Sequence, residues 1–491
     1  MKKQVLGMLG LTVAVTGVTS CNSADTDDSK INILWLFGED VDPWMGPFGD
    51  STVATPNIDF LAENGVTFTH CYSVSGVSSA TRSALATGVM ATTIGVHNHR
   101  SGRTYGAPAH LPDYVQILPQ IMRKNGYFTY NYGKDDFNWQ YNWRDYWAGD
   151  FEETWYDKCG LEISWEDRKD KTQPFFGEIE LKGGKFNLGK GDITKLVDTS
   201  KIRVPSYYPN IPSTKLNMAH HYAQIMATDK SIGEVLDKMK KDPKVYKNTI
   251  VIFFSDNGWA GILRDKQFLY DGGIHMPLII SAPGNPKLLK QKGVRDDLVS
   301  LLDLTATTLK LAGIDIPDYY ESKDLFAPDY HRDYVVAAKD RCDFTIDRVR
   351  AIRTLDFKYI RNFMTDRALM QPSYRDKKQS YKDFMALYKS GKVKFEDAWL
   401  SPVRVPEELY DLHADPDETH NLANNPKYKD ELIKMRERLD TWIKETGDQG
   451  QYPESEAALQ VVYDHWGVRS VNPEYDRVKN KTKRTKKAHK K

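Results

Sequence analysis

Two apolar runs stand out along the chain, and each leads directly into acidic or amide side chains. The run INILWLFG precedes Glu39 and Asp40, and the run NTIVIFFS precedes Asp256 and Asn257. Unbroken apolar runs of this length are typical of strands that are buried on both faces of a parallel sheet. Because open α/β sheets bind ligands beyond the carboxyl ends of their strands, we expect these four side chains to share one site.

Helical patterns lie between and after these runs. The segment TPNIDFLAENG has an apolar face and a glycine stop, and residues 218–241 form a longer amphipathic pattern. The alternation predicts an α/β domain over residues 31–340, with a large mixed or mostly parallel sheet sandwiched by helices. Shorter segments follow, among them the helical pattern KDELIKMRERLDTWIKETG, and they predict a smaller C-terminal α+β domain over residues 341–475.

Residues 1–30 are expected to serve export rather than the fold. Lys2 and Lys3 precede an apolar run, Val5–Val18, which is short for a membrane span and suits a secretory signal. Cys21 follows the small residues VTS, as in a bacterial lipoprotein whose cysteine carries the lipid; plain cleavage before it is the alternative. We therefore expect an exported protein of a Gram-negative bacterium, periplasmic or anchored by lipid to the outer membrane or cell surface.

Composition and charge narrow the classes of partner. The chain has 491 residues, 40% of them hydrophobic, which suffices for a large core and more than one domain. Its formal net charge of +1 gives no indication of a nucleic-acid partner, although residues 476–491 form a basic tail. Beyond the signal, Cys71, Cys159 and Cys342 make neither a metal-binding spacing nor a disulfide framework, and a Cys159–Cys342 pair stays open.

The side chains at the two strand ends favour a hard divalent cation. Carboxylate and amide oxygens suit Ca²⁺, with Mg²⁺ as the alternative, and the neighbouring positions lack the His or Cys that zinc prefers. Acidic residues after a strand also commonly cap the next helix, and that alternative stays open for these residues taken alone.

The hydroxyl-rich stretch SVSGVSSATRSALATG favours a metal site over helix capping for these strand-end residues. From Ser78 to Gly88 it reads S-x-A-x-R-x-x-L-x-T-G and resembles the signature of type I sulfatases, C/S-x-P/A-x-R followed by leucine and TG. In that family the Cys or Ser is oxidised to formylglycine (3-oxoalanine), whose hydrate attacks sulfur, and the arginine, here Arg82, serves maturation and then holds the hydrate. The resemblance implies formylglycine at Ser78 and a sulfatase-maturing enzyme that accepts serine. Ordinary capping of a Ser/Thr-rich helix is the alternative.

Further segments match the same family in the same order. They are TPNIDFLA, GYFTYNYGK, FFSDNG, KQFLYDGGIHMPLI and PEELYDLHADPDETHNLA, so that the likeness spans about residues 31–426. The resemblance implies an alkaline-phosphatase-like fold, and it places Lys134 and Lys266 at the sulfate-binding lysines. The metal ligands that it implies are Glu39, Asp40, Ser78, Asp256 and Asn257.

Among the departures from the family pattern, three concern the expected metal and acid–base positions. Glu39 stands where an aspartate is usual, so the side chain that reaches the metal is longer by one methylene group. Asp136 and Lys185 stand where two histidines are usual, the second being counted from Pro174. We include both in the catalytic set, and we expect Lys185 to bind sulfate and to protonate the leaving oxygen if crowding by the metal and Lys266 lowers its pKa.

Three segments outside these motifs are candidates for contact with the rest of the substrate. The loop TTIGVHNHRSGR follows the nucleophile helix, the stretch KDRCDFTIDRVR lies at the expected domain junction, and FNWQYNWRDYWAGDFEETWYDK is rich in aromatic residues that can stack on sugars. The alternatives are charged loops for the first two and core packing for the third. The first two resemble the branch near heparan N-sulfatases, so N-sulfate stays open beside O-sulfate. The candidate substrate residues are His97, His99, Arg100, Asp340, Arg341 and Arg348, with His275 as a further substrate residue or acid.

The sequence thus predicts a sulfuric ester hydrolase that removes sulfate from a sulfated glycan by means of formylglycine and a divalent cation. A phosphodiesterase or phosphonate hydrolase of the same superfamily is one alternative. A catalytically impaired glycan-binding relative is another, because the two usual histidines are replaced.

The replacement by Lys185 gives a test. We expect Lys185→Ala to lower the rate more for sugar sulfates, which have poor leaving groups, than for activated aryl sulfates, because only the former need a proton on the leaving oxygen. Steady-state kinetics on both substrate classes measures this difference. Equal losses would mean that Lys185 only binds sulfate.

Overall fold

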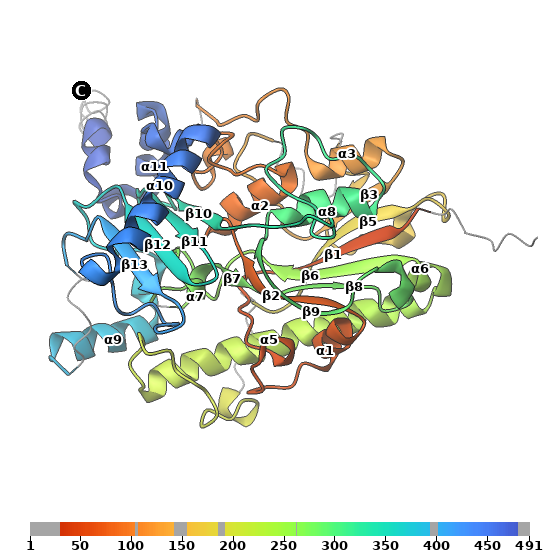
Figure 1. Ribbon diagram of the computed structural model, residues 1–491, viewed down its shortest axis with the longest axis horizontal. Helices are drawn as coiled ribbons and strands as arrows, with labels where there is room; N and C mark the ends of the chain where they lie inside the picture. Colours follow the sequence, from red (N-terminus) through yellow and green to blue (C-terminus); the bar gives the residue numbers. More distant parts are fainter. Residues whose placement is uncertain are drawn as a thin grey trace, which may run out of the picture.

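A nine-stranded, mostly parallel sheet runs through the larger part of the molecule (Figure 1). Its order is β4-β3-β5-β1-β6-β8-β2-β7, with β9 paired to β2; β8 and β7 run antiparallel to their neighbours. The strands are β1 (Asn32–Gly38), β2 (Gly65–Tyr72), β3 (Phe128–Tyr132), β4 (Lys158–Cys159), β5 (Phe175–Glu180), β6 (Thr249–Ser255), β7 (His275–Met276), β8 (Leu278–Ser281) and β9 (Gly293–Ser300).

The computed structural model describes residues 30–103, 107–141, 155–184, 192–261, 263–392 and 401–479. The expected signal with Cys21, the catalytic candidate Lys185 and the end of the basic tail lie outside the described residues. None of the described helices is long and apolar enough to span a membrane.

Helices cover both faces of the large sheet, as the apolar runs predicted. Along β1, Ile33 and Trp35 pack with the helices α2, α3 and α8, whereas Leu34 and Leu36 pack with the long helix α5 on the other face. Figure 1 shows these two helical layers on opposite sides of the sheet. The helices of this domain are α1 (Pro56–Glu63), α2 (Ser78–Thr87), α3 (Leu118–Lys124), α5 (Pro212–Lys240), α6 (Pro243–Lys247), α7 (Asp271–Ile274) and α8 (Asp303–Leu311).

A second, antiparallel sheet of four strands forms the smaller C-terminal part. It begins with β10, just before the boundary expected after Asp340, and α10 packs on it through Leu432, Met435 and Leu439. The predicted fold class, an α/β sheet sandwiched by helices with a smaller α+β domain, is confirmed. The elements of this part are β10 (Val335–Lys339), β11 (Val349–Arg353), β12 (Phe357–Asn362), β13 (Glu407–Asp411), α9 (Gln379–Lys389), α10 (Lys429–Thr446) and α11 (Glu456–Trp466).

The aromatic segment after β3 contributes to the core where it is described. Phe137 and Trp139 are buried and stack at 4.4 Å between ring centroids, with Tyr141 and Trp155 around them. These rings pack against one another, so core packing, the alternative given above, accounts for this part of the segment. Residues 142–154 of the same segment lie outside the described residues.

The cysteines and the charged surface add two further points. Cys71, Cys159 and Cys342 are buried and free, so Cys159 and Cys342 do not pair.

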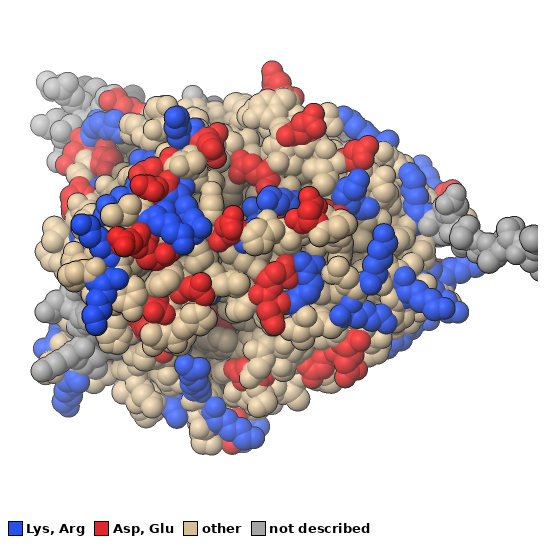
Figure 2. All heavy atoms as spheres, viewed as in Figure 1, with Lys and Arg blue, Asp and Glu red and all other residues tan. Residues whose placement is uncertain are grey.

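Figure 2 shows acidic and basic side chains interspersed over the face that it presents.

The TPN motif is explained by a contact between two helices. Helix α1 begins at Pro56, and its free backbone amides at Asn57 and Ile58 both donate to Asp229 Oδ1 of α5 at 2.8 Å. The Asn57 side chain donates to the other carboxylate oxygen at 2.8 Å. Asp229 thus satisfies donors that every helix N-terminus leaves open and fixes α1 to α5.

Replacing Asp229 by alanine is expected to lower the free energy of unfolding by about 2–3 kcal/mol, because a buried charged acceptor is lost. Urea unfolding followed by tryptophan fluorescence measures it. Asp237→Ala on the same helix is the matched control, since that carboxylate is exposed and pairs only with Lys240; we expect less than about 0.5 kcal/mol there. An equal effect of the two substitutions would contradict the role of Asp229.

Candidate active site

The carboxyl ends of β1 and β6 lie side by side and bring the predicted acidic residues together. The strands are parallel neighbours, with Gly38 opposite Ser255, so the next residues of each strand leave the sheet at the same level. Oxygens of Glu39, Asp40 and Asp256 all lie within 4.8 Å of one another, and all three residues are buried. Asp40 takes a left-handed backbone conformation with φ 58°, which an aspartate tolerates better than most residues.

Asn257 joins this cluster to the hydroxyl of Ser78. Its side-chain nitrogen donates to Asp40 Oδ1 at 2.8 Å, and its side-chain oxygen accepts from Ser78 Oγ at 3.0 Å. All four strand-end residues therefore converge with Ser78, as the sequence predicted.

Two buried oxygens in this cluster fit a cation. Among the described residues, Asp40 Oδ2 and Asp256 Oδ2 have no hydrogen-bond partner, although neither reaches solvent. Unpaired buried carboxylate oxygens are costly, and a hard cation with oxygen ligands removes that cost. The donors are all carboxylates and one amide, which suits Ca²⁺ or Mg²⁺.

Three cationic side chains surround the carboxylates, each from a different segment. Lys134, after β3, donates to Glu39 Oε1 at 2.5 Å, and Lys266, after β6, donates to Asp40 and lies 3.3 Å from Ser78 Oγ. Arg82 of α2 lies 3.6 Å from Asp256. The two lysines that the resemblance placed at the sulfate and the arginine that it placed at the hydrate are thus all at the cluster.

Lys134 is positioned by its neighbour Gly133 and by Glu180. Gly133 has φ 124°, and a Cβ there would lie 2.5 Å from the Glu180 side chain, so only glycine fits. The Lys134 amide donates to Glu180 Oε2 at 2.7 Å, and its carbonyl accepts from Arg82 at 2.6 Å.

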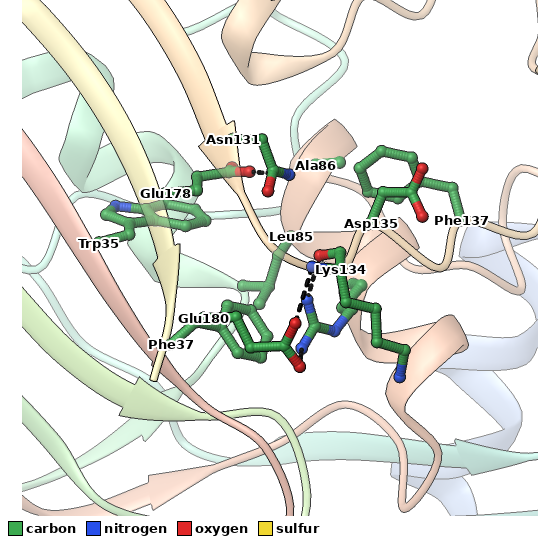
Figure 3. Close-up of a pocket in the computed structure, with 11 residues that line it drawn as sticks. Trp35, Phe37, Leu85, Ala86, Asn131, Lys134, Asp135, Phe137, Glu178 and Glu180 are labelled. Carbon is green, nitrogen blue, oxygen red and sulfur yellow. Dashed lines mark hydrogen bonds and ion pairs between the residues drawn. The ribbon is translucent and has the colours of Figure 1, made fainter. Parts of the chain in front are cut away.

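Glu180, at the end of β5, is a site residue that the sequence argument missed. It lies 3.7 Å from the Arg82 guanidinium, and Figure 3 shows it beside Lys134 and Phe37. Burial raises the pKa of Glu180 to about 7, against the pull of Arg82. Its signal in the sequence was an acidic residue at the end of a third buried strand, which is the pattern that identified Glu39 and Asp256.

Helix α2 is polar, yet all ten of its residues are buried. No side chain caps the start of the helix; Thr87 bonds back within the helix, and other hydroxyls bond to distant segments. Ser79 bonds to His99 at 2.7 Å, and Ser83 accepts from the Asn138 amide at 3.0 Å. Ordinary capping is therefore not the reason for the hydroxyl-rich stretch.

Of the two positions where histidine is usual, Asp136 lies at the site. It pairs with Lys134 at 3.0 Å and lies 3.6 Å from Arg103. Although burial opposes it, the Lys134 ammonium group holds the pKa of Asp136 below its usual range. Asp136 is therefore ionised near neutral pH and is unsuited to donate a proton.

His99, a candidate substrate residue, contacts the helix that begins at Ser78. Besides Ser79 it faces Asp343 at 3.4 Å. Burial lowers the pKa of His99 to about 4, so the imidazole is neutral near pH 7. The Arg100 amide donates to Asn138 Oδ1 at 2.7 Å, which fixes the same loop against the segment after β3.

The candidates at the domain junction lie in a separate hollow of about 260 Å³, which they line with His97. Asp340 pairs with Arg350 at 3.1 Å, Arg341 with Glu454, and Arg348 with Asp448 at 3.3 Å. Their charges are thus largely neutralised within the protein, and the structure does not bring them to the carboxylate cluster.

His275, which was expected to be a substrate residue or an acid, contacts β2 and is not among the residues that the structure groups at the cluster. Its ring nitrogen bonds to the Thr69 carbonyl at 2.7 Å, and its ring stacks on Tyr72 at 5.0 Å. The short antiparallel pairing of β7 with β2 satisfies the imidazole locally and leaves it no role as an acid at the cluster.

Comparison with known proteins agrees with this geometry. The family model described as Sulfatase matches residues 31–186 and 199–314, more than half of the chain. The chain belongs to the sulfatase family. A second model, described as N-sulphoglucosamine sulphohydrolase, C-terminal, matches residues 258–394 of this sulfatase.

Individual relatives cover most of the sulfatase chain. An ulvan-active sulfatase of Formosa agariphila is 32% identical over 473 residues, covering 87% of this chain and 76% of its own. The human N-sulphoglucosamine sulphohydrolase is 26% identical over 474 residues, covering 85% and 90%. The solved phosphonate monoester hydrolase of Agrobacterium radiobacter, at 17% identity and a TM-score of 0.58, covers 87% of this chain and 98% of its own.

These findings establish an alkaline-phosphatase-like fold and an enzyme that hydrolyses sulfate esters. The fold alone is shared with a phosphonate hydrolase, so it is the family match that identifies the reaction.

The cluster predicts a cation dependence that can be measured apart from activity. Asp256 Oδ1 accepts two backbone N–H bonds, from Asp40 at 3.2 Å and Asn257 at 3.0 Å, while Oδ2 accepts no hydrogen bond and lies 3.6 Å from Arg82. Asp256→Asn keeps an acceptor for those bonds but removes the charge. We expect it to abolish calcium binding in calorimetric titration and to abolish activity with the fold intact; Asp256→Ala is expected to do the same.

The control is Glu63→Ala, because Glu63 is an exposed carboxylate on α1; this variant should bind calcium like the wild type. Undiminished calcium binding by Asp256→Asn would exclude this cluster as the metal site.

Proposed function

We propose that this sulfatase works with formylglycine made from Ser78 and with one hard divalent cation, Ca²⁺ or Mg²⁺. The observation that carries the proposal is the position of Ser78. Its hydroxyl lies 3.0 Å from Asn257 Oδ1 and 3.3 Å from Lys266 Nζ, at the rim of three buried carboxylates. A group attached to residue 78 is therefore within reach of both the cation ligands and a lysine.

Each absent group supplies one kind of chemistry. Hydrated formylglycine offers one hydroxyl to attack sulfur and a second whose deprotonation releases sulfate again, whereas plain serine would need external water for that release. Glu39, Asp40, Asp256, Asn257 and residue 78 would hold the cation, which would neutralise charge on the sulfate oxygens.

The residues of the chain supply the rest of the electrostatics. In this structure Lys134 pairs with Glu39, and Lys266 pairs with Asp40. When these two carboxylates bind a cation instead, both ammonium groups become available to the sulfate oxygens. Arg82 is held by Glu180, Asp256 and the Lys134 carbonyl one helical turn after Ser78, where it fixes the nucleophile turn. Asp136, being ionised, orients Lys134 and is not the proton donor.

We further propose that the chain is exported and carries a lipid on Cys21, as the basic residues, the apolar run and the cysteine of residues 1–21 indicate. Export would bring the enzyme to glycans outside the cell. Before export, a sulfatase-maturing enzyme acts on Ser78 in the producing cell.

Peptide mass spectrometry on protein from its native host tests the central proposal. We expect residue 78 to have lost two hydrogens and to react with a hydrazide, while Ser75 and Ser79 remain serine. The mass of the peptide that contains Cys21, from the same digest, shows whether this cysteine carries a lipid.

Activity of variants completes that test. Ser78→Ala is expected to lower sulfate release from an aryl sulfate by at least about 10³-fold, and Ser75→Ala, in the same loop, should behave like the wild type. Full activity from protein with unmodified Ser78, or faster hydrolysis of aryl phosphonates than of aryl sulfates, would favour the phosphonate hydrolase alternative. Glycan binding without turnover of any ester would favour the impaired relative.

A further inference from the structure

A turn of the C-terminal domain brings two cationic side chains to the edge of the active site. The 3-10 turn Tyr374–Lys377 carries Arg375, and Lys378 follows it directly. Arg375 donates to the Lys266 carbonyl at 3.3 Å, and Lys378 donates to the Ala260 carbonyl. Both acceptors belong to the loop after β6 that also carries the sulfate-binding lysine.

Neither cation has a carboxylate partner in the described part of the chain. Arg375 is 4% exposed, and its Nε is buried without any hydrogen bond. Other buried cations of the same domain are paired: Arg350 with Asp448 at 2.8 Å, and Lys358 with Glu418 at 2.8 Å. A buried guanidinium without a counter-charge is costly, so an anion from outside the chain would stabilise this turn.

Lys378 lines a hollow of about 200 Å³ that has Asp40 in its wall. Other lining residues are Trp259, Asn217 and His220, and Asn217 Nδ2 is buried with no partner among the described residues. The hollow thus combines an aromatic wall, amide and imidazole donors and one ammonium group beside a predicted metal ligand.

The ammonium group remains charged under working conditions. Burial and then Arg375 lower the pKa of Lys378 to about 8, so most of it is protonated at pH 7. Asp265, a nearby carboxyl, gives it little compensation, because burial raises the pKa of Asp265 well above its usual range and two tyrosines, Tyr207 and Tyr208, bond to it.

We propose that Lys378 binds a second anionic substituent, sulfate or carboxylate, on the sugar whose sulfate is removed, with Arg375 adding positive potential from behind. The substrate class is then a sugar unit with two negative charges rather than one. The inference rests on the proposed function, since it takes the group at Asp40 and Ser78 as the reacting sulfate. An ammonium that meets an anion in a partly buried site gains a charge-assisted hydrogen bond.

The experiment compares matched sugars on the full-length, matured enzyme. One arm uses monosaccharides with a single sulfate and the same sugars with a second sulfate at each position in turn; the other arm replaces the second sulfate by a uronate carboxylate. We expect kcat/KM for the preferred doubly charged sugar to exceed that of its singly charged partner by about tenfold or more. Lys378→Met should reduce this ratio about tenfold, and Lys378→Arg should largely restore it.

Lys377→Met is the matched control, because Lys377 is exposed on the same turn; it should keep the wild-type ratio. Thermal unfolding of each variant confirms that the fold is kept. A wild-type ratio near one, a ratio unchanged in Lys378→Met, or an equal fall in Lys377→Met would each overturn the inference while leaving the sulfatase mechanism standing. Absence of sulfate release from every sugar and aryl sulfate by the wild type would instead overturn the proposed function, and the inference with it.

Discussion

The structure depends on holding three like charges together where water cannot screen them. Two carboxylates at 4.8 Å, the outer limit within this cluster, repel each other by about 3.5 kcal/mol at an effective dielectric constant of 20. The neighbouring parallel strands β1 and β6 force Glu39, Asp40 and Asp256 into this arrangement. Lys134, Lys266 and Arg82 offset the repulsion, and the positions of α2 and of the loops after β3 and β6 follow from that need.

Much of this arrangement could be predicted, because it follows from local patterns. The two apolar runs identify strands buried on both faces, and the acidic residues that follow each run identify the edge of the sheet where a ligand binds. The glycine before Lys134 is needed for a backbone conformation that a side chain would strain. Features of this kind are written in a few consecutive residues, so a sequence displays them directly.

The rest could not be predicted, because it depends on partners far along the chain. The hydroxyls of α2 resemble helix caps in the sequence, and only the fold shows that Ser79 meets His99 and Ser83 meets Asn138. His275 follows a motif of the family, yet two residues of antiparallel pairing with β2 turn its ring toward Thr69. Arg341 and Arg348 read as free cations until their partners Glu454 and Asp448, about a hundred residues later, come into contact with them.

The complete burial of α2 has a consequence for the order of events during synthesis. An enzyme that oxidises Ser78 must hold the surrounding peptide in its own cleft, and a residue 3% exposed on an interior helix cannot be presented that way. Oxidation and folding therefore compete in time. The pocket closes only when Asp40 meets Asn257, 217 residues later in the chain, and contacts of such high sequence separation form slowly. If Ser78 is oxidised as proposed, the time needed to close this long loop is the time in which the modifying enzyme can act, and a variant that folded faster would risk trapping an unmodified serine.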